Sequence, residues 1–315
     1  MLRFISILTL IFFTVKIANA DLKMGEEAYD DSGFGRVCAG CTNNSHQYKS
    51  PQNFIKIAKI IGKDDRRFIT KKSDEKKYVV AGNVYAYEKD CQACGQSSGT
   101  VVQSANIVIT NRHAFFDKKC QRRNTLGKHP ISGSSTKNWW DGYVFSIQEN
   151  AQLIDYEIDF GELISACPGR GQVDDVAILK LKNKVTYSGS VITPAKLIVV
   201  GEYYLKHTVL RTPVSIAGYG ITQDSKSEQE AQRRLSSNIR IGSLLKYHDG
   251  EPMVYHKGDT TQGTSGAGLL LFRGPNDDEP EMFSIHKGSL MDSPYNVSVG
   301  VRQEFINKIS EMLKR

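Results

Sequence analysis

The stretch GDTTQGTSGAGLLL, residues 258–271, joins a glycine-rich loop to an apolar run and sets Ser265 in the middle of that loop. Glycines let a backbone turn tightly, so that neighbouring N–H groups can converge on one point. Converging N–H groups stabilise the oxyanion that forms when a serine attacks a carbonyl group. The apolar run is typical of a buried strand, which would anchor the loop in a core. The stretch therefore predicts a nucleophilic serine, with an ordinary glycine-rich turn as the alternative.

Two stretches further upstream supply the groups that a serine nucleophile needs. Residues 107–114, IVITNRHA, place His113 just after a β-branched run, and residues 174–181, DDVAILKL, place Asp175 just before another. An imidazole can take the proton of a serine hydroxyl near neutral pH, and a buried carboxylate fixes the tautomer of that imidazole. The chain order His, Asp, Ser is that of the chymotrypsin type and differs from the orders of subtilisins and α/β-hydrolases.

With these motifs the chain resembles the trypsin-like serine peptidases and, within them, the bacterial glutamyl endopeptidases. The resemblance is carried by TNRH at 110–113, DVAIL at 175–179, DTTQGTSG at 259–266 and SIHKG at 284–288. It extends over residues 58–315. It implies an all-β fold of two six-stranded antiparallel β-barrels of the chymotrypsin type, followed by a C-terminal α-helix. It also implies a serine endopeptidase that hydrolyses peptide bonds through an acyl-enzyme.

The same resemblance gives individual residues their expected roles. The catalytic triad would consist of His113, Asp175 and Ser265. Asp174 competes for the role of the acid, but Asp175 directly precedes the Val-Ala-Ile-Leu of the motif and is preferred. The backbone N–H groups of Gly263 and Ser265 would form the oxyanion hole.

Substrate preference is expected from two residues that match the primary pocket of glutamyl endopeptidases. Thr260 and His286 can both donate a hydrogen bond to a carboxylate, which predicts cleavage after Glu and also after Asp. For His286 the alternative is a structural strand histidine. Asp259 indicates the opposite preference, because an acid at the base of the pocket selects Arg or Lys. The alternative is that Asp259 has a structural role. Thr264 replaces the aspartate of trypsin-like zymogens, which disfavours their mode of activation and favours the glutamyl endopeptidase branch.

Residues 1–20 have the three parts of a secretory signal peptide. Arg3 gives a positive start, residues 4–15 are apolar, and the tripeptide ending at Ala20 fits a small-x-small cleavage site. The apolar part is short for a membrane span, and Lys16 interrupts it. We therefore expect cleavage after Ala20 and a secreted or periplasmic protein that no membrane anchor holds.

Residues 21–58 are expected to form an N-terminal extension or propeptide, because positions 21–50 are polar and rich in Gly, Ser and Asn. A processing cut is hypothesised near Lys59. The following residues, Ile60-Ile61-Gly62, resemble the start of the mature glutamyl endopeptidase chain.

Short strand signals separated by turn signals fill the rest of the chain, as in an all-β barrel or sandwich. Residues 59–190 are expected to form the first barrel, with His113 and Asp175. Residues 191–315 are expected to form the second barrel, with Ser265, and to end in an amphipathic helix over 302–314.

The chain has six cysteines: Cys38, Cys41, Cys91, Cys94, Cys120 and Cys167. An even number in an exported chain predicts disulfides, although six cysteines allow 15 pairings. The trypsin-like resemblance favours a bridge around His113, between Cys94 and Cys120. A divided zinc site or close disulfides within the two Cys-x-x-Cys pairs are the alternatives.

The formal net charge of +7 is spread along the sequence, and two of the positive charges, Arg3 and Lys16, lie in the signal peptide. No basic stripe with interleaved aromatic residues is present, so nucleic-acid binding is not expected. We expect protein or peptide substrates and no metal or organic cofactor, and leave the oligomeric state open. The alternative function is that of a catalytically silent homologue acting as an extracellular binding module.

Overall fold

The computed structural model describes residues 66–69, 71–88, 91–117, 119–122, 138–150, 152–166, 171–220, 233–239, 241–248, 250–261, 263–274, 279–289 and 294–315. The expected signal peptide (1–20), the extension (21–58) and the processing site near Lys59 lie outside the described residues. Of the cysteines, Cys38, Cys41 and Cys167 also lie outside, as do the side chains of Cys91 and Cys94. The expected Cys94–Cys120 bridge therefore stays a prediction.

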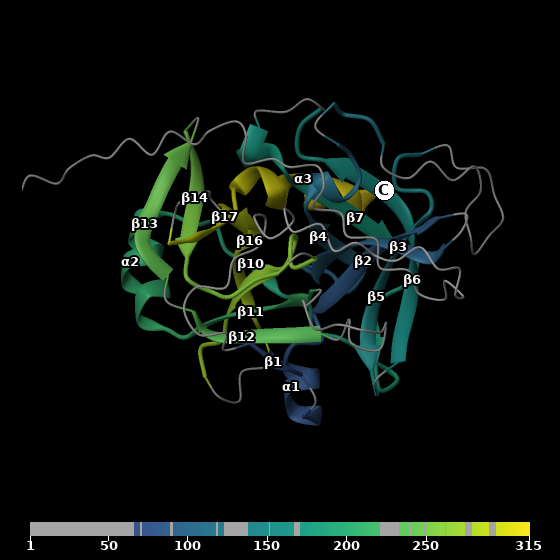
Figure 1. The fold of residues 1–315 in the computed structure, drawn as a ribbon, viewed down its shortest axis with the longest axis horizontal. Coiled ribbons are helices and arrows are strands. Elements are labelled where there is room, and N and C mark those ends of the chain that lie inside the picture. The colour runs from purple at the N-terminus through teal and green to yellow at the C-terminus, as the bar shows by residue number, and fades with distance from the viewer. Residues whose placement is uncertain are drawn as a thin grey trace, which may run out of the picture.

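The first barrel consists of six strands: β2 (Ala81–Glu88), β3 (Cys91–Val101), β4 (Ile107–Thr110), β5 (Tyr143–Glu149), β6 (Gln152–Leu163) and β7 (Ala177–Leu181). They close in the order β2-β3-β4-β7-β6-β5, with every neighbouring pair antiparallel (Figure 1). β-Branched and aromatic side chains such as Ile109, Ile178 and Phe145 are fully buried and fill the interior. Gly82 makes room for them, since a Cβ there would lie 2.1 Å from the Phe145 ring.

The second sheet contains β1 (Arg67–Phe68), β10 (Lys196–Leu197), β11 (Val214–Tyr219), β12 (Arg233–Ile239), β13 (Ile241–His248), β14 (Glu251–His256), β15 (Gly268–Leu271), β16 (Glu281–Ser289) and β17 (Asn296–Gly300). Its order is β1-β12-β11-β15-β16-β17-β14-β13, and β10 pairs with β16. β12 and β13 are neighbours in the sequence, but they lie near opposite ends of this path. The described strands thus form one closed six-stranded barrel and a second, nine-stranded sheet.

Besides a two-stranded sheet of β8 (Thr186–Tyr187) and β9 (Ser190–Val191), three α-helices and three single-turn helices complete the described part of the chain. They are α1 (Lys72–Lys77), α2 (Glu202–His207), α3 (Gln303–Lys314), η4 (Arg112–Ala114), η5 (Gly171–Asp174) and η6 (Val209–Arg211). The predicted C-terminal helix is confirmed as α3, which buries Phe305, Ile309 and Met312 at helical spacing. It returns to the first barrel, where Lys308 Nζ lies 2.8 Å from Glu162 Oε1 on β6. No helix among the described residues is both long and apolar enough to cross a membrane.

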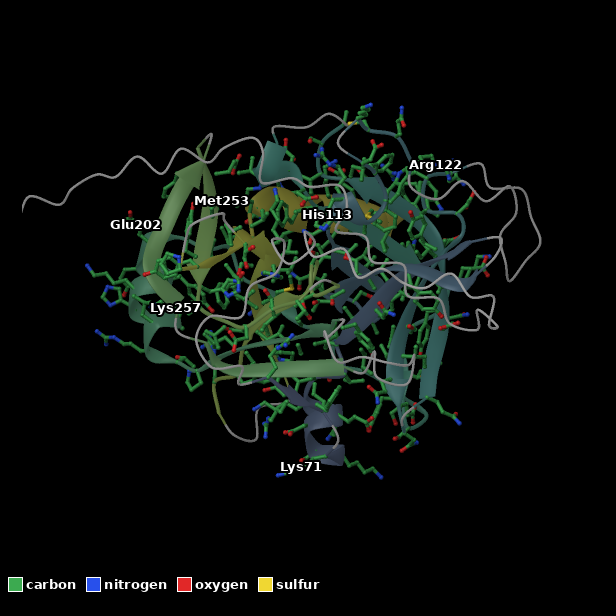
Figure 2. The ribbon with its side chains drawn as sticks, viewed as in Figure 1. Lys71, His113, Arg122, Glu202, Met253 and Lys257 are labelled. Atoms are coloured by element: carbon green, nitrogen blue, oxygen red, sulfur yellow. The ribbon has the colours of Figure 1, made fainter. Side chains whose placement is uncertain are left out.

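The two barrels share a continuous apolar core. Ile109 of the first barrel belongs to the same buried cluster as Leu270 and Met282 of the second. Across this junction the hydroxyl of Tyr78 donates to Ser215 Oγ at 3.1 Å. The candidate site lies at the junction, with His113 near the middle of the molecule (Figure 2).

Candidate active site

The pairing of β4 with β7 explains why His113 and Asp175 meet. These strands are antiparallel, and Thr110 at the end of β4 pairs with Ala177 at the start of β7. The chain leaves β4 into η4, which carries His113, and enters β7 from η5, directly after which Asp175 lies. Two residues far apart in the sequence are therefore brought to the same edge of the barrel.

Asp175 holds His113 at two points. Its Oδ2 lies 2.7 Å from His113 Nδ1, and its Oδ1 accepts the backbone N–H of His113 at 2.9 Å. The backbone carbonyl of Asp175 accepts a third bond, from Asn111 Nδ2 at 2.9 Å. Because a carboxylate oxygen accepts at Nδ1, the proton of the neutral imidazole lies there and Nε2 is left as the proton acceptor.

Asp175 and His113 differ in burial, as a shielded carboxylate and an accessible base require. The side chain of Asp175 is fully buried, whereas that of His113 is 21% exposed. The carboxylate is therefore shielded from water while part of the imidazole remains accessible. Asp174, the competing acid, instead points toward Arg302, whose Nη2 lies 3.5 Å from its Oδ1.

Two glycines with positive φ shape the loop around Ser265. Gly263 has φ 91° and Gly266 has φ 88°, in the region that L-residues rarely adopt. At Gly266 space is also missing, since a Cβ would lie 2.0 Å from the carbonyl oxygen of Ser98. Thr264 is bound within the same loop, because its Oγ1 accepts the N–H of Thr261 at 3.2 Å. Thr264, which stands where trypsin-like zymogens have an aspartate, therefore finds its hydrogen-bond partner within the loop itself.

Strand β3 of the first barrel supports this loop through its carbonyl groups. The carbonyl of Ser265 accepts the N–H of Ser98 and the hydroxyl of Ser97, each at 2.6 Å. The carbonyl of Gly263 accepts Ser98 Oγ at 2.8 Å. Within the described residues, the backbone N–H groups of Gly263 and Ser265 donate to no partner. Both donors of the predicted oxyanion hole are therefore available to a ligand.

The hydroxyl of Ser265 is directed at a residue that the sequence analysis did not single out. It donates to the backbone carbonyl of Lys287 at 3.0 Å. No described contact joins this hydroxyl to His113. Nζ of Lys287 lies 3.8 Å from Asp175 Oδ2, so Lys287 contacts both the acid and the serine. Its place next to His286 in the motif SIHKG was the signal available in the sequence.

His286 forms a second buried pair, with a histidine that the sequence analysis also missed. His286 Nδ1 lies 3.2 Å from His256 Nε2, and His256 Nδ1 accepts the N–H of Gly258 at 3.2 Å. Because His256 accepts at Nδ1, its proton lies on Nε2 and is donated to His286 Nδ1. The remaining proton of the neutral His286 therefore lies on Nε2.

Burial keeps both imidazoles uncharged. It lowers the pKa of His256 to about 3. It also lowers the pKa of His286 well below its ordinary value, an effect to which His256 and His113 add. The predicted pocket histidine is thus a neutral hydrogen-bond donor and not a cation.

Thr260 and Asp259 lie side by side in the sequence but in different surroundings. Thr260 is fully buried, and its hydroxyl has no hydrogen-bond partner within the described residues. Asp259 lines a small cavity together with Arg66, Thr261 and Thr264. An arginine in the same cavity provides a positive charge near Asp259, which favours a structural role for this carboxylate over selection of a basic substrate.

Among the described residues, no group of three or more His, Cys, Asp and Glu side chains is placed to hold a metal ion. The groups present at the candidate site are the side chains of His113, Asp175 and Ser265, the backbone donors and a buried imidazole.

No family profile matches the chain, and no curated protein matches it. Its structure is similar to those of two solved chymotrypsin-fold proteins. One is Glu endopeptidase, in complex with MPD, with a TM-score of 0.52 at 15% identity over 82% of this chain and 100% of that chain. The other is a scabies mite inactivated protease paralogue, with a TM-score of 0.50 at 14% identity over 76% of this chain and 97% of that chain. The predicted chymotrypsin fold is thereby confirmed.

Proposed function

We propose that the chain is a serine endopeptidase that hydrolyses peptide bonds through an acyl-enzyme. The observation that carries this proposal is the pair of hydrogen bonds that His113 donates to the carboxylate of Asp175. It orients the imidazole and leaves Nε2 as a base, at the junction that also carries Ser265. Chymotrypsin-fold neighbours support the class of reaction through the fold they share with this chain.

In the proposed first step, the Ser265 hydroxyl turns from the Lys287 carbonyl toward His113 Nε2. Its oxygen attacks the substrate carbonyl carbon while Nε2 takes its proton. The negative charge that forms on the carbonyl oxygen is stabilised by the free N–H groups of Gly263 and Ser265.

In the steps that follow, the imidazolium of His113 is stabilised by the buried carboxylate of Asp175. It returns the proton to the leaving amine, so that the peptide bond breaks and the acyl-enzyme forms. A water molecule then acts as the second nucleophile and attacks the ester carbon while the His113 imidazole takes its proton. The ester bond to Ser265 breaks, the imidazole returns the proton to the serine oxygen, and the carboxylic acid product is released.

We further propose a preference for Glu, and also Asp, before the cut bond. The Nε2–H of His286 and the unsatisfied hydroxyl of Thr260 are two buried, neutral donors. A buried carboxylate is stable only if donors replace its hydration shell, and these two groups supply such donors. One neighbour in the comparison is a Glu endopeptidase, which is consistent with this preference.

Export belongs to the same proposal. The leader over residues 1–20 and the cleavage site after Ala20 indicate a secreted or periplasmic enzyme, in which disulfides such as Cys94–Cys120 form. N-terminal sequencing of the exported protein tests the second, later cut that is proposed near Lys59. A start following Lys59 supports it, and a start at Asp21 contradicts it.

A catalytically silent binding module is the second candidate function. One observation favours it: the Ser265 hydroxyl donates to the Lys287 carbonyl, and no described contact joins it to His113. A chymotrypsin-fold neighbour is an inactivated protease paralogue, so this fold occurs without activity. Hydrogen bonds between catalytic groups often form only in the complex with substrate, and we therefore prefer the enzyme.

Cleavage of matched peptides tests the proposed function. Peptides that differ only in Glu, Asp, Lys or Leu before the scissile bond are incubated with the processed wild type and with Ser265→Ala. The proposal predicts cleavage by the wild type alone, fastest after Glu. Preferential cleavage after Lys contradicts the assignment of the pocket, and an absence of cleavage by a folded, processed wild type contradicts the enzyme.

A further inference from the structure

Lys287 occupies an irregular position in β16. Its neighbour His286 pairs with Ser298 on β17, whereas Gly288 pairs with the adjacent Val297. Lys287 is therefore the extra residue of a β-bulge, which leaves the regular ladder and redirects its backbone and side chain. Bulges are common next to functional sites because they re-aim a side chain.

The redirected residue contacts two members of the proposed triad. Its carbonyl accepts the Ser265 hydroxyl at 3.0 Å, and its Nζ lies 3.8 Å from Asp175 Oδ2. This is the same oxygen that lies 2.7 Å from His113 Nδ1. The ammonium and the imidazole thus share one carboxylate oxygen, in a place where the lysine side chain is only 6% exposed.

The charged and titratable groups that face Lys287 come from several elements. Asp175 precedes β7, Arg112 and His113 lie in η4, and the neutral His286 precedes Lys287 on β16. Burial lowers the pKa of Lys287 to about 8, with Asp175 acting in the opposite direction and Arg112 adding to the lowering. Lys287 is therefore still mainly an ammonium in the range near pH 6.5 where an ordinary histidine titrates.

We propose that Lys287 is a positioning residue that keeps His113 in its neutral, proton-accepting form at lower pH by sharing the Asp175 carboxylate. A carboxylate beside an imidazole favours the imidazolium, and a cation on the same carboxylate weakens that effect. Removal of the lysine charge makes Asp175 a stronger partner for the imidazolium. His113 then takes up a proton at higher pH and stops acting as a base sooner as the pH falls. The inference rests on the proposed function, in which His113 is the general base.

The test follows the titration of the His113 imidazole by NMR in the full, processed chain, because this readout does not require activity. Wild type is compared with Lys287→Met, which keeps the length of the side chain, and with Lys287→Arg, which keeps the charge. Lys308→Met is the matched control, since it removes one positive charge from α3, where the partner is Glu162. We expect Lys287→Met to raise the midpoint by about one pH unit, and the other two variants to stay near wild type.

The pH dependence of kcat/KM is measured on the same proteins. In Lys287→Met, the pH at which kcat/KM falls on the acidic side is expected to rise together with the NMR midpoint. An unchanged His113 midpoint in folded Lys287→Met overturns the inference, as does an equal shift in Lys308→Met. If Lys287→Met does not fold, Lys287→Gln replaces it with the same expectation. A shifted midpoint in a chain that cleaves no peptide supports the inference and contradicts the proposed function, so the two failures are distinguishable.

Discussion

His256 Nε2 faces His286 Nδ1 at 3.2 Å inside the second barrel, and both imidazoles are almost completely buried. The N–H of Gly258 fixes the tautomer of His256, which in turn fixes the tautomer of His286. The backbone amide of Gly258 thus determines which nitrogen of His286 carries a proton. In the proposed function, an acidic substrate would meet a neutral donor near neutral pH.

Replacing His256 should weaken the preference for Glu without abolishing cleavage. In His256→Leu the donor to His286 Nδ1 is lost, and His286 can place its proton on either nitrogen. We expect the ratio of kcat/KM for Glu over Leu peptides to fall about tenfold, the equivalent of one hydrogen bond to a charged group. His207→Leu, at an exposed histidine on α2, is the control and should leave the ratio unchanged. An unchanged ratio in His256→Leu would show that this pair does not serve specificity.

The same pair should make the fold sensitive to acid. Both folded-state pKa values are lowered, so below about pH 6.5 the unfolded chain takes up protons that the folded chain refuses. The free energy of unfolding is therefore expected to fall from pH 6.5 down to about 3, by at most about 1.4 kcal/mol per pH unit for each histidine. Urea unfolding of wild type and His256→Leu over this range checks the expectation, and a shallower pH dependence is predicted for the variant. Parallel curves for the two proteins would contradict it.

Asp175 and Asp174 should behave differently when each carboxylate is made an amide. Asp175→Asn can no longer accept at the His113 Nδ1 position with a full charge, and the imidazole can adopt the wrong tautomer. We expect kcat to fall by about 10⁴ with little change in stability, as in the triad of well-studied serine proteases. Asp174→Asn weakens the contact with Arg302 and should lower the melting temperature more than it lowers kcat. The reverse pattern would identify Asp174 as the catalytic acid.

Gly266 should tolerate no side chain, for reasons of both conformation and space. Gly266→Ala combines a φ of 88° with a Cβ placed 2.0 Å from the Ser98 carbonyl. Gly250 is the matched control, because its φ is 81° and a Cβ there meets nothing within 4 Å. We expect about 1–2 kcal/mol of destabilisation for Gly250→Ala and at least about 3 kcal/mol for Gly266→Ala, together with loss of activity. Equal effects in chemical unfolding would mean that the close approach to Ser98 is not real.

Much of the fold could be predicted because its local signals agree with its tertiary structure. β-Branched runs such as residues 107–110 and 176–181 became buried strands, and the apolar stripe at Phe305, Ile309 and Met312 became α3. Other segments were decided by pairing that a local pattern does not contain. The apolar stretch KLIVV at residues 196–200 is typical of a strand, but it forms strand only over Lys196–Leu197, where β10 pairs with β16. The stretch YVVA at residues 78–81 also has the pattern of a strand, but it begins as a turn after α1, so β2 starts at Ala81.

The site was predictable where chemistry is tied to a short motif. His113, Asp175 and Ser265 each lie beside a strand in a recognisable sequence, and the structure brings the first two into direct contact. Lys287 and His256 were missed because their importance comes from a bulge in β16 and from the meeting of β14 with the nucleophile stretch. Sequence spacing alone does not contain either relationship.

The most direct test of the central claim is labelling of the processed, folded protein with a fluorophosphonate, which reacts with an activated serine. The account predicts that the wild type is labelled at Ser265, that Ser265→Ala is not labelled, and that Asp175→Asn is labelled far more slowly. If a well-folded and processed wild type remains unlabelled, the serine is not activated, and the chain is a binding module with a chymotrypsin fold.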